Sequence, residues 1–127
     1  MPEQTVLVVD DEPLIRMMLA DALVDEGYRV FEAANVLEAV AVFGMRHIDF
    51  LVTDVDMPGS LNGFDLVRFV RNHDSRVGVI VVSGGRIPGD GVLQSGEVFI
   101  AKPYRLDSVI DNLVAKVSAY PDVRLAI

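Results

Sequence analysis

Five polar side chains of this 127-residue chain each follow a short apolar run, and together they could carry out phosphate chemistry. They belong to Asp10, Asp11, Asp54, Ser83 and Lys102. A set of carboxylate oxygens without sulfur or imidazole suits Mg²⁺ and does not suit zinc. An ammonium group and a hydroxyl group beside such an ion could hold the oxygens of a phosphoryl group. The residue types therefore indicate metal-assisted phosphoryl transfer, provided that the fold brings them together.

The apolar pattern predicts an α/β fold that would do so. Short β-branched runs at residues 5–9, 28–33, 50–53, 77–82 and 97–101 alternate with stretches of helical spacing that begin near residues 13, 36, 64 and 106. Strands this apolar on both faces suit a parallel sheet with helices on each side, and the alternation predicts a doubly wound sheet. All strands of such a sheet end at one edge, where ligands bind. We therefore expect the five polar side chains to meet there.

The segment between residues 83 and 99 departs from this alternation. It contains five glycines and one proline, and both residue types disfavour the interior of a helix. We expect at most one or two helical turns here, around residues 92–94.

Each polar residue also has a purely structural interpretation. Asp11 and Glu12 could cap a helix, Asp54 could start a turn, and Ser83 and Lys102 could belong to ordinary connections. For any single residue this interpretation is the stronger one. The joint placement of five such residues at one edge favours the functional interpretation.

Composition narrows the possible partners. The net charge of −8 argues against nucleic acid and against an anionic membrane surface, because phosphate would be repelled. The chain has no cysteine, and its apolar stretches are too short to span a bilayer. We expect a soluble cytoplasmic protein.

Four stretches in this order resemble the receiver domain of bacterial two-component response regulators. They are VLVVDDE (6–12), DVDMPG (54–59) leading to Gly63, VVSG (81–84) and FIAKPY (99–104). The resemblance runs over about residues 5–119. It implies a flavodoxin-like, CheY-like fold with five parallel strands in the order 2-1-3-4-5 and a short or degraded fourth helix. It also implies that residues 1–127 form a single receiver domain, with its core at about 5–119 and no output domain.

The resemblance also implies roles for the site residues. Asp54 is expected to accept a phosphoryl group from a phosphohistidine. Mg²⁺ is expected to bind Asp11, Asp54 and the main-chain carbonyl of Asp56 directly and Asp10 largely through water. The ion would neutralise charge on the transferring oxygens.

Further expectations concern the switch that phosphorylation would control. Lys102 would pair with Asp54 or its phosphate, and the Lys102–Pro103 peptide would be cis. Ser83 would bond the phosphate and Phe99 would follow it inward, as an equilibrium between two packings. Asp56 and Gly85 occupy positions expected to tune the rates of phosphate gain and loss.

The expected partners are a histidine kinase or a histidine phosphotransfer protein, with a possible downstream protein. The protein itself is expected to be a monomer or a weak dimer. Such a domain is a switch and not an enzyme, although it would catalyse its own phosphorylation and dephosphorylation. The resemblance has three departures: one additional residue in the loop before Gly63, no hydroxyl on Phe99, and the degraded helix. The last of these predicts that a stiff helical output surface is missing.

Several alternatives remain open at this point. A haloacid-dehalogenase-like phosphohydrolase would place its nucleophile on the first strand and its acidic pair last, whereas here Asp10 and Asp11 come first. A flavodoxin-type binding module would need a phosphate loop where the acidic residues stand. The chain could also be a receiver of a hybrid kinase, or a receiver-like domain that has lost phosphorylation, although the full set of site residues argues against the loss.

Overall fold

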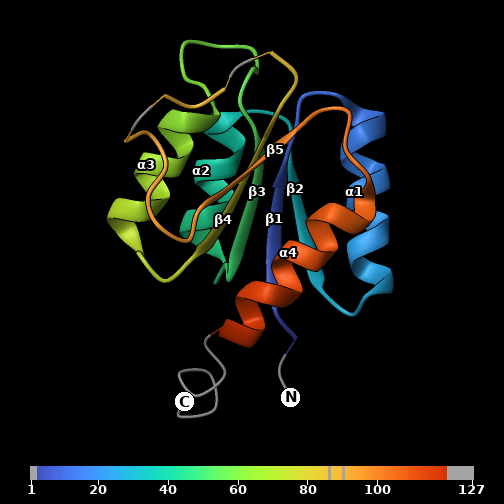
Figure 1. Cartoon of the computed structure of the whole chain (residues 1–127). Coiled ribbons are helices and arrows are strands. Elements are labelled where there is room, and N and C mark those ends of the chain that lie inside the picture. The colour runs from blue at the N-terminus through green and yellow to red at the C-terminus, as the bar shows by residue number, and fades with distance from the viewer. Residues whose placement is uncertain (1–2, 86, 90, 120–127) are drawn as a thin grey trace.

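Strands and helices alternate along the chain as the apolar pattern predicts (Figure 1). The computed structural model describes residues 3–85, 87–89 and 91–119. The elements are β1 (Thr5–Val9), α1 (Pro13–Asp25), β2 (Arg29–Ala33), α2 (Val36–Met45), β3 (Phe50–Asp54), α3 (Gly63–His73), β4 (Gly78–Ser83), β5 (Val98–Ala101) and α4 (Leu106–Ala119). Strand β3 is one residue longer than predicted, so Asp54 is its last residue.

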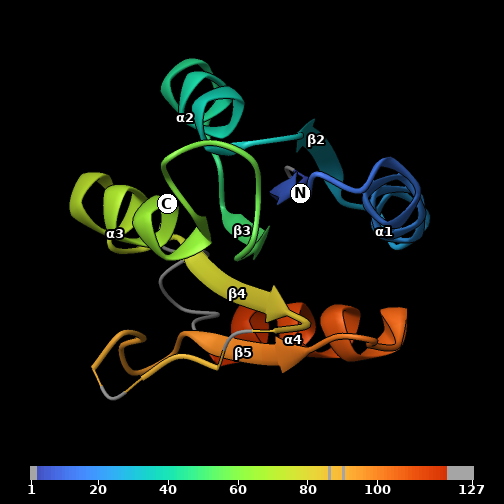
Figure 2. The ribbon, with the colours of Figure 1, turned by 90° about the horizontal axis from the view of Figure 1, so that it is seen from above.

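The five strands form one parallel sheet in the order β2-β1-β3-β4-β5, which confirms the predicted topology. Helices α1 and α4 cover one face and helices α2 and α3 cover the other, as the view from above shows (Figure 2). In Figure 1 the strands run upward from the N-terminus, so their carboxyl ends meet at the upper edge. That edge carries the candidate site.

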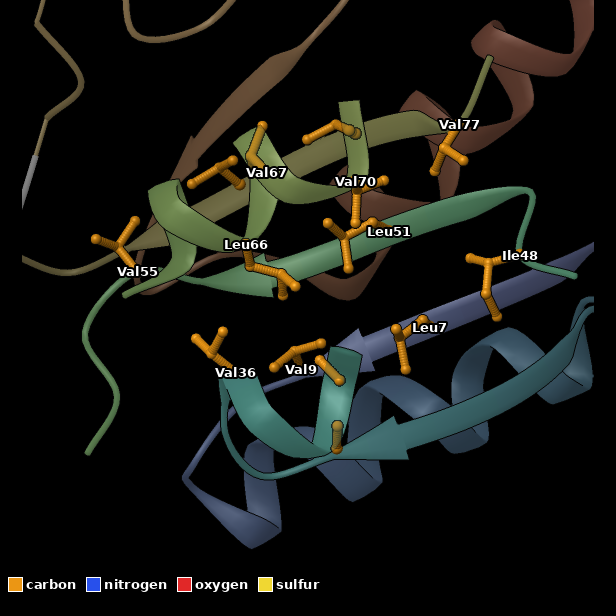
Figure 3. Close-up of a cluster of buried hydrophobic side chains, with 14 residues drawn as sticks. Leu7, Val9, Val36, Ile48, Leu51, Val55, Leu66, Val67, Val70 and Val77 are labelled. Atoms are coloured by element: carbon orange, nitrogen blue, oxygen red, sulfur yellow. The ribbon is translucent and has the colours of Figure 1, made fainter. Parts of the chain in front are cut away.

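Side chains alternate between the two faces of each strand, and each face has its own core. On the α2/α3 face, Leu7 and Leu51 pack with Leu66 and Val70 of α3 (Figure 3). On the other face, a second cluster joins the strands to α1 and α4, with Leu23 and Leu113 fully buried. Burial of one such side chain stabilises the fold by about 1.5–3 kcal/mol. Both layers therefore hold the central strands rigidly beneath the site.

The connection from β4 to β5 contains no helix in the residues described there, as the glycine and proline content predicts. An ion pair ties it to α3 instead: Arg71 Nε donates to Glu97 Oε2 (3.0 Å), and Arg71 Nη2 donates to the Val92 carbonyl (3.2 Å). Leu93 packs against the α2/α3 core. In its described residues, these hydrogen bonds and the packing of Leu93 hold the connection against α3 and the core. Within the described residues, no helix is long and apolar enough to cross a bilayer.

Candidate functional site

Asp54 is a buried acidic group that the sheet edge places beside a basic partner. It is 4% exposed at the end of β3. The Val55 N–H donates to Asp54 Oδ1 (2.9 Å), and Asp54 Oδ2 lies 3.4 Å from Lys102 Nζ. The first carboxylate oxygen is thus held by the main chain, and the second faces the ammonium group. These contacts favour the functional interpretation of Asp54 over the interpretation as a simple turn residue.

Lys102 reaches the site from the end of β5. Its N–H donates to the Ser83 carbonyl (2.9 Å), and the Lys102–Pro103 peptide is cis, which confirms that expectation. Lys102 Nζ lies 3.1 Å from Asp10 Oδ2 and 3.3 Å from a Glu12 carboxylate oxygen. Burial works against the charged ammonium, but the hydrogen bond to Asp10 and the neighbouring carboxylates outweigh it and raise the pKa of Lys102. The ammonium is therefore shared among three carboxylates.

The loop after β1 supplies the other acidic groups. Asp10 is buried, its Oδ1 accepts from the Glu12 N–H (2.9 Å), and its carbonyl accepts from Arg16 (2.8 Å). One carboxylate oxygen from each of four residues lies within 4.8 Å of the others, and the four are Asp10, Asp11, Glu12 and Asp54. Such an oxygen-only set has the chemistry of a Mg²⁺ site.

Glu12 is the member of this cluster that the sequence did not single out. Its position just before Pro13 suggested a helix cap, and it does occupy the position before α1. However, its side chain makes no capping hydrogen bond and turns toward Lys102. The only sequence signal for this role was the third acidic residue in a row.

Asp56 was predicted to be close to the site, and its side chain is exposed and lies outside the group of four. The carboxylate lies beside Gly85: a Cβ added to Gly85 would be 3.7 Å from Asp56 Oδ2. The two residues predicted to tune rates are thus neighbours at the rim of the site.

Ser83 and Phe99 share one face of the sheet. Ser83 of β4 pairs with Ala101 of β5, and Phe99 lies two residues before Ala101 in β5. Because side chains alternate along a strand, the side chains of Ser83 and Phe99 point to the same face, the one covered by α3. The Ser83 hydroxyl accepts from the Gly85 N–H (3.3 Å), and Phe99 packs against the α2/α3 core. Ser83 therefore lies at the site edge and Phe99 lies deeper on the same face of the sheet, next to the core.

Known proteins share this sheet and this sequence pattern. The family model of the response regulator receiver domain matches residues 6–114. The chain belongs to this family. Sporulation initiation phosphotransferase F of Bacillus subtilis is 29% identical to the receiver over 116 residues, which covers 87% of the receiver and 91% of that protein. The sensor histidine kinase RcsC of Escherichia coli is 32% identical over 114 residues, which covers 87% of the receiver and 12% of the kinase.

The structure of the response regulator TrrA from Thermotoga maritima, in complex with Mg²⁺–BeF, has a TM-score of 0.80 and 26% identity to the receiver. The match covers 89% of the receiver and 98% of TrrA. Receiver domains are phosphorylation-dependent switches of two-component signalling, which bind Mg²⁺ in an acidic pocket and interact with histidine kinases or phosphotransfer proteins. The phosphohydrolase alternative gains no support from these relatives.

The receiver holds Asp54 in an environment that resists ionisation. Burial, followed by the nearby Asp10 charge, raises the pKa of Asp54 to about 6 from an ordinary value of 3.8, although Lys102 and the Val55 N–H oppose the shift. The native carboxyl thus binds its proton more tightly than the unfolded chain does. The contribution of Asp54 to stability is therefore present below pH 4 and is lost as pH rises through about 6.

We expect this loss to be visible in metal-free receiver. The difference in unfolding free energy between Asp54→Asn and wild type should shift in favour of the variant by roughly 2 kcal/mol between pH 4 and pH 8, because one pKa unit corresponds to 1.36 kcal/mol. Urea denaturation at both pH values measures it. Saturating Mg²⁺ should abolish the advantage of the variant at pH 8. Parallel pH curves for the two proteins would contradict the prediction.

Tyr104, two residues after Lys102, has a buried hydroxyl that lacks a hydrogen-bond partner in the part of the chain that the structure describes. Its ring packs against the α1/α4 core. Burial, followed by the Asp10 charge, raises the pKa of Tyr104. The phenol therefore stays neutral beside the acidic cluster.

Removal of this hydroxyl should not destabilise the receiver. A buried polar group without a partner costs about 1–3 kcal/mol, so Tyr104→Phe is expected to raise the unfolding free energy by up to about 1 kcal/mol. Urea denaturation followed by circular dichroism measures the change, with Tyr28→Phe as a comparison in the same core. A loss of more than about 1 kcal/mol in Tyr104→Phe would show that the hydroxyl has a partner in solution.

Proposed function

We propose that Asp54 is the phosphoacceptor of this receiver and that it takes a phosphoryl group from the phosphohistidine of a kinase or phosphotransfer protein. The observation that carries the proposal is the position of Asp54 Oδ2, buried, 3.4 Å from the Lys102 ammonium and inside a cluster of four carboxylates. A buried carboxylate beside one ammonium and a cation site has the groups that phosphoryl transfer requires.

The transfer itself is a displacement at phosphorus. A lone pair of an Asp54 oxygen forms the new P–O bond while the bond between phosphorus and the donor nitrogen breaks. The electron pair of that bond stays on the imidazole nitrogen, and the product is an acyl phosphate. With acetyl phosphate as donor, acetate leaves with the electron pair. Catalysis by the receiver of its own phosphorylation is part of this proposal.

Mg²⁺ fits the residues present, because every candidate ligand is a hard oxygen. Asp10, Asp11 and Asp54 would hold the ion, together with the main-chain carbonyl of Asp56. The ion would neutralise negative charge on the transferring oxygens. The TrrA structure, a complex with Mg²⁺–BeF, supports Mg²⁺ as the ion.

The remaining site residues would read the phosphorylated state. Lys102 would bind one phosphoryl oxygen, and the Ser83 hydroxyl would exchange its bond with the Gly85 N–H for another phosphoryl oxygen. Because Phe99 follows Ser83 along the same face of the sheet, a shift of Ser83 would open space into which Phe99 moves. Asp56 and Gly85, at the rim, would tune the rates at which phosphate is gained and lost.

An apolar patch marks where the phosphodonor would rest. Leu14, Met17 and Met18 are 69%, 52% and 52% exposed on the first turns of α1, directly after the acidic loop. A protein that brings phosphohistidine to Asp54 must cover the elements around the site, and this patch offers apolar area for that contact. Phosphohistidine is made from ATP inside the cell, so the proposed role places the receiver in the cytoplasm.

The output of this receiver would not pass through a stiff helix between β4 and β5, since the described part of that connection is not helical. We propose that residues 5–119 form the receiver core and that it acts by binding a partner or by passing its phosphate to another histidine. Monomeric or weakly dimeric receiver would suffice for either role.

Incubation with acetyl phosphate tests the proposal without any partner. With Mg²⁺ the receiver should take up one phosphoryl group that hydroxylamine removes, as expected of an acyl phosphate, and peptide mapping should place it on Asp54. With EDTA the label should be absent. An unlabelled protein, or a label on another residue, would overturn the proposal.

A further inference from the structure

Glu12 contacts the ammonium group on which the proposed phosphoryl transfer depends. Lys102 Nζ lies 3.1 Å from Asp10, 3.3 Å from Glu12 and 3.4 Å from Asp54, so Asp54 is the most distant of its three carboxylates. The loop after β1 supplies two of these three carboxylates, those of Asp10 and Glu12, and so competes with Asp54 for Lys102.

The three carboxylates differ in how firmly they are fixed. Asp10 and Asp54 are buried at strand ends, and each accepts a main-chain N–H. The Glu12 side chain is 57% exposed, and it makes no capping bond to α1. An exposed glutamate is ordinarily surrounded by water, and ordering its side chain costs conformational entropy. Its contact with Lys102 therefore sets the position of Glu12.

We propose that Glu12 is a positioning residue that draws the Lys102 ammonium away from Asp54 and so slows phosphorylation; this inference rests on the proposed function. When a donor phosphoryl group enters, its oxygens gain negative charge as the donor bond breaks and the bond to Asp54 forms. Lys102 stabilises that charge only when it faces the phosphoryl oxygens. Asp10 and Asp54 would direct their oxygens to the bound cation at that stage, and Glu12 would remain as the carboxylate that competes for Lys102.

A second role for Glu12 is compatible with the same cluster, because its carboxylate oxygen belongs to the group of four within 4.8 Å. As a metal ligand, Glu12 would strengthen Mg²⁺ binding, and its removal would slow phosphorylation at limiting Mg²⁺. The two roles thus predict opposite effects on rate and different effects on Mg²⁺ affinity.

The test compares initial rates of phosphorylation by acetyl phosphate at saturating Mg²⁺. Glu12→Gln should react roughly two- to fivefold faster than wild type, the range expected for the release of one partly exposed ion pair. Glu12→Asp keeps the charge but is one methylene shorter, so it should also react faster. Asp21→Asn removes one exposed charge elsewhere on α1 and should react at the wild-type rate.

A double-mutant cycle with Lys102→Ala distinguishes positioning from a structural effect. In the Lys102→Ala background, Glu12→Gln should leave the residual rate unchanged, because the group that Glu12 positions is gone. The dissociation constant of Mg²⁺, measured by calorimetry, should be nearly the same in Glu12→Gln and wild type.

Three results would overturn the inference while leaving the proposed function intact: equal rates for Glu12→Gln and wild type, a wild-type rate for Glu12→Asp, or a tenfold weaker Mg²⁺ affinity in Glu12→Gln. The first result would show that Glu12 has no role in the rate. The second would show that only its charge matters, and the third that Glu12 is a metal ligand. If wild type itself takes up no label, the proposed function has failed instead.

Discussion

The Asp54→Asn variant is expected to take up no phosphoryl group from acetyl phosphate or from a phosphohistidine donor, with a rate at least about a thousandfold below wild type. An amide nitrogen or oxygen cannot replace the carboxylate oxygen that attacks phosphorus. The fold should survive, because the amide oxygen can still accept from the Val55 N–H and the other Lys102 partners remain. Mass spectrometry of the intact protein measures the label, and circular dichroism confirms folding.

Asp56→Asn is the matched control for this experiment, since it makes the same chemical change on an exposed carboxylate two residues away. It should still be labelled and should bind Mg²⁺ as wild type does, while its rate of dephosphorylation changes. A folded Asp54→Asn protein that is labelled like wild type would show that another residue is the acceptor. An unchanged dephosphorylation rate in Asp56→Asn would remove the rate-tuning role of Asp56.

Gly63→Ala is expected to lower the unfolding free energy by more than about 3 kcal/mol and to slow phosphorylation. Gly63 begins α3 directly against the end of β3, and its N–H donates to the Val55 carbonyl (2.9 Å). A Cβ at this position would overlap the Asp54 carbonyl oxygen and lie 2.9 Å from Val55 Cα. Both contacts are with main-chain atoms at the end of β3 and just after it, so relief of the overlap requires that α3 or the site itself move.

Gly44→Ala provides the comparison, because Gly44 lies inside α2 and a Cβ there meets nothing within 4 Å. Alanine is the better helix former, so this variant should be more stable than wild type by about 0.5–1 kcal/mol. Urea denaturation followed by circular dichroism measures both variants. A Gly63→Ala protein within 1 kcal/mol of wild type would mean that α3 can withdraw from β3 at little cost.

The residues that reach the site edge could be identified from the amino-acid sequence. Apolar runs identify the strands, and parallel strands must end at the same edge, so Asp10, Asp54, Ser83 and Lys102 converge once the topology is known. The lack of a helix in the described residues between β4 and β5 could also be predicted from the sequence, because glycine and proline disfavour helices through their own backbone. These features depend on local chemistry and on the direction of the strands.

The contacts between individual side chains became known only from the folded structure. Helical spacing places Leu14 and Met18 on the same predicted inward face as Leu19 and Leu23. In the structure Leu14 and Met18 are nevertheless exposed, whereas Leu19 and Leu23 are buried. The ion pair from Arg71 to Glu97 and the contact of Glu12 with Lys102 join residues 26 and 90 positions apart in the chain. Such contacts depend on how helices pack across strands and on the rotamer that each side chain adopts, and neither is encoded in local spacing.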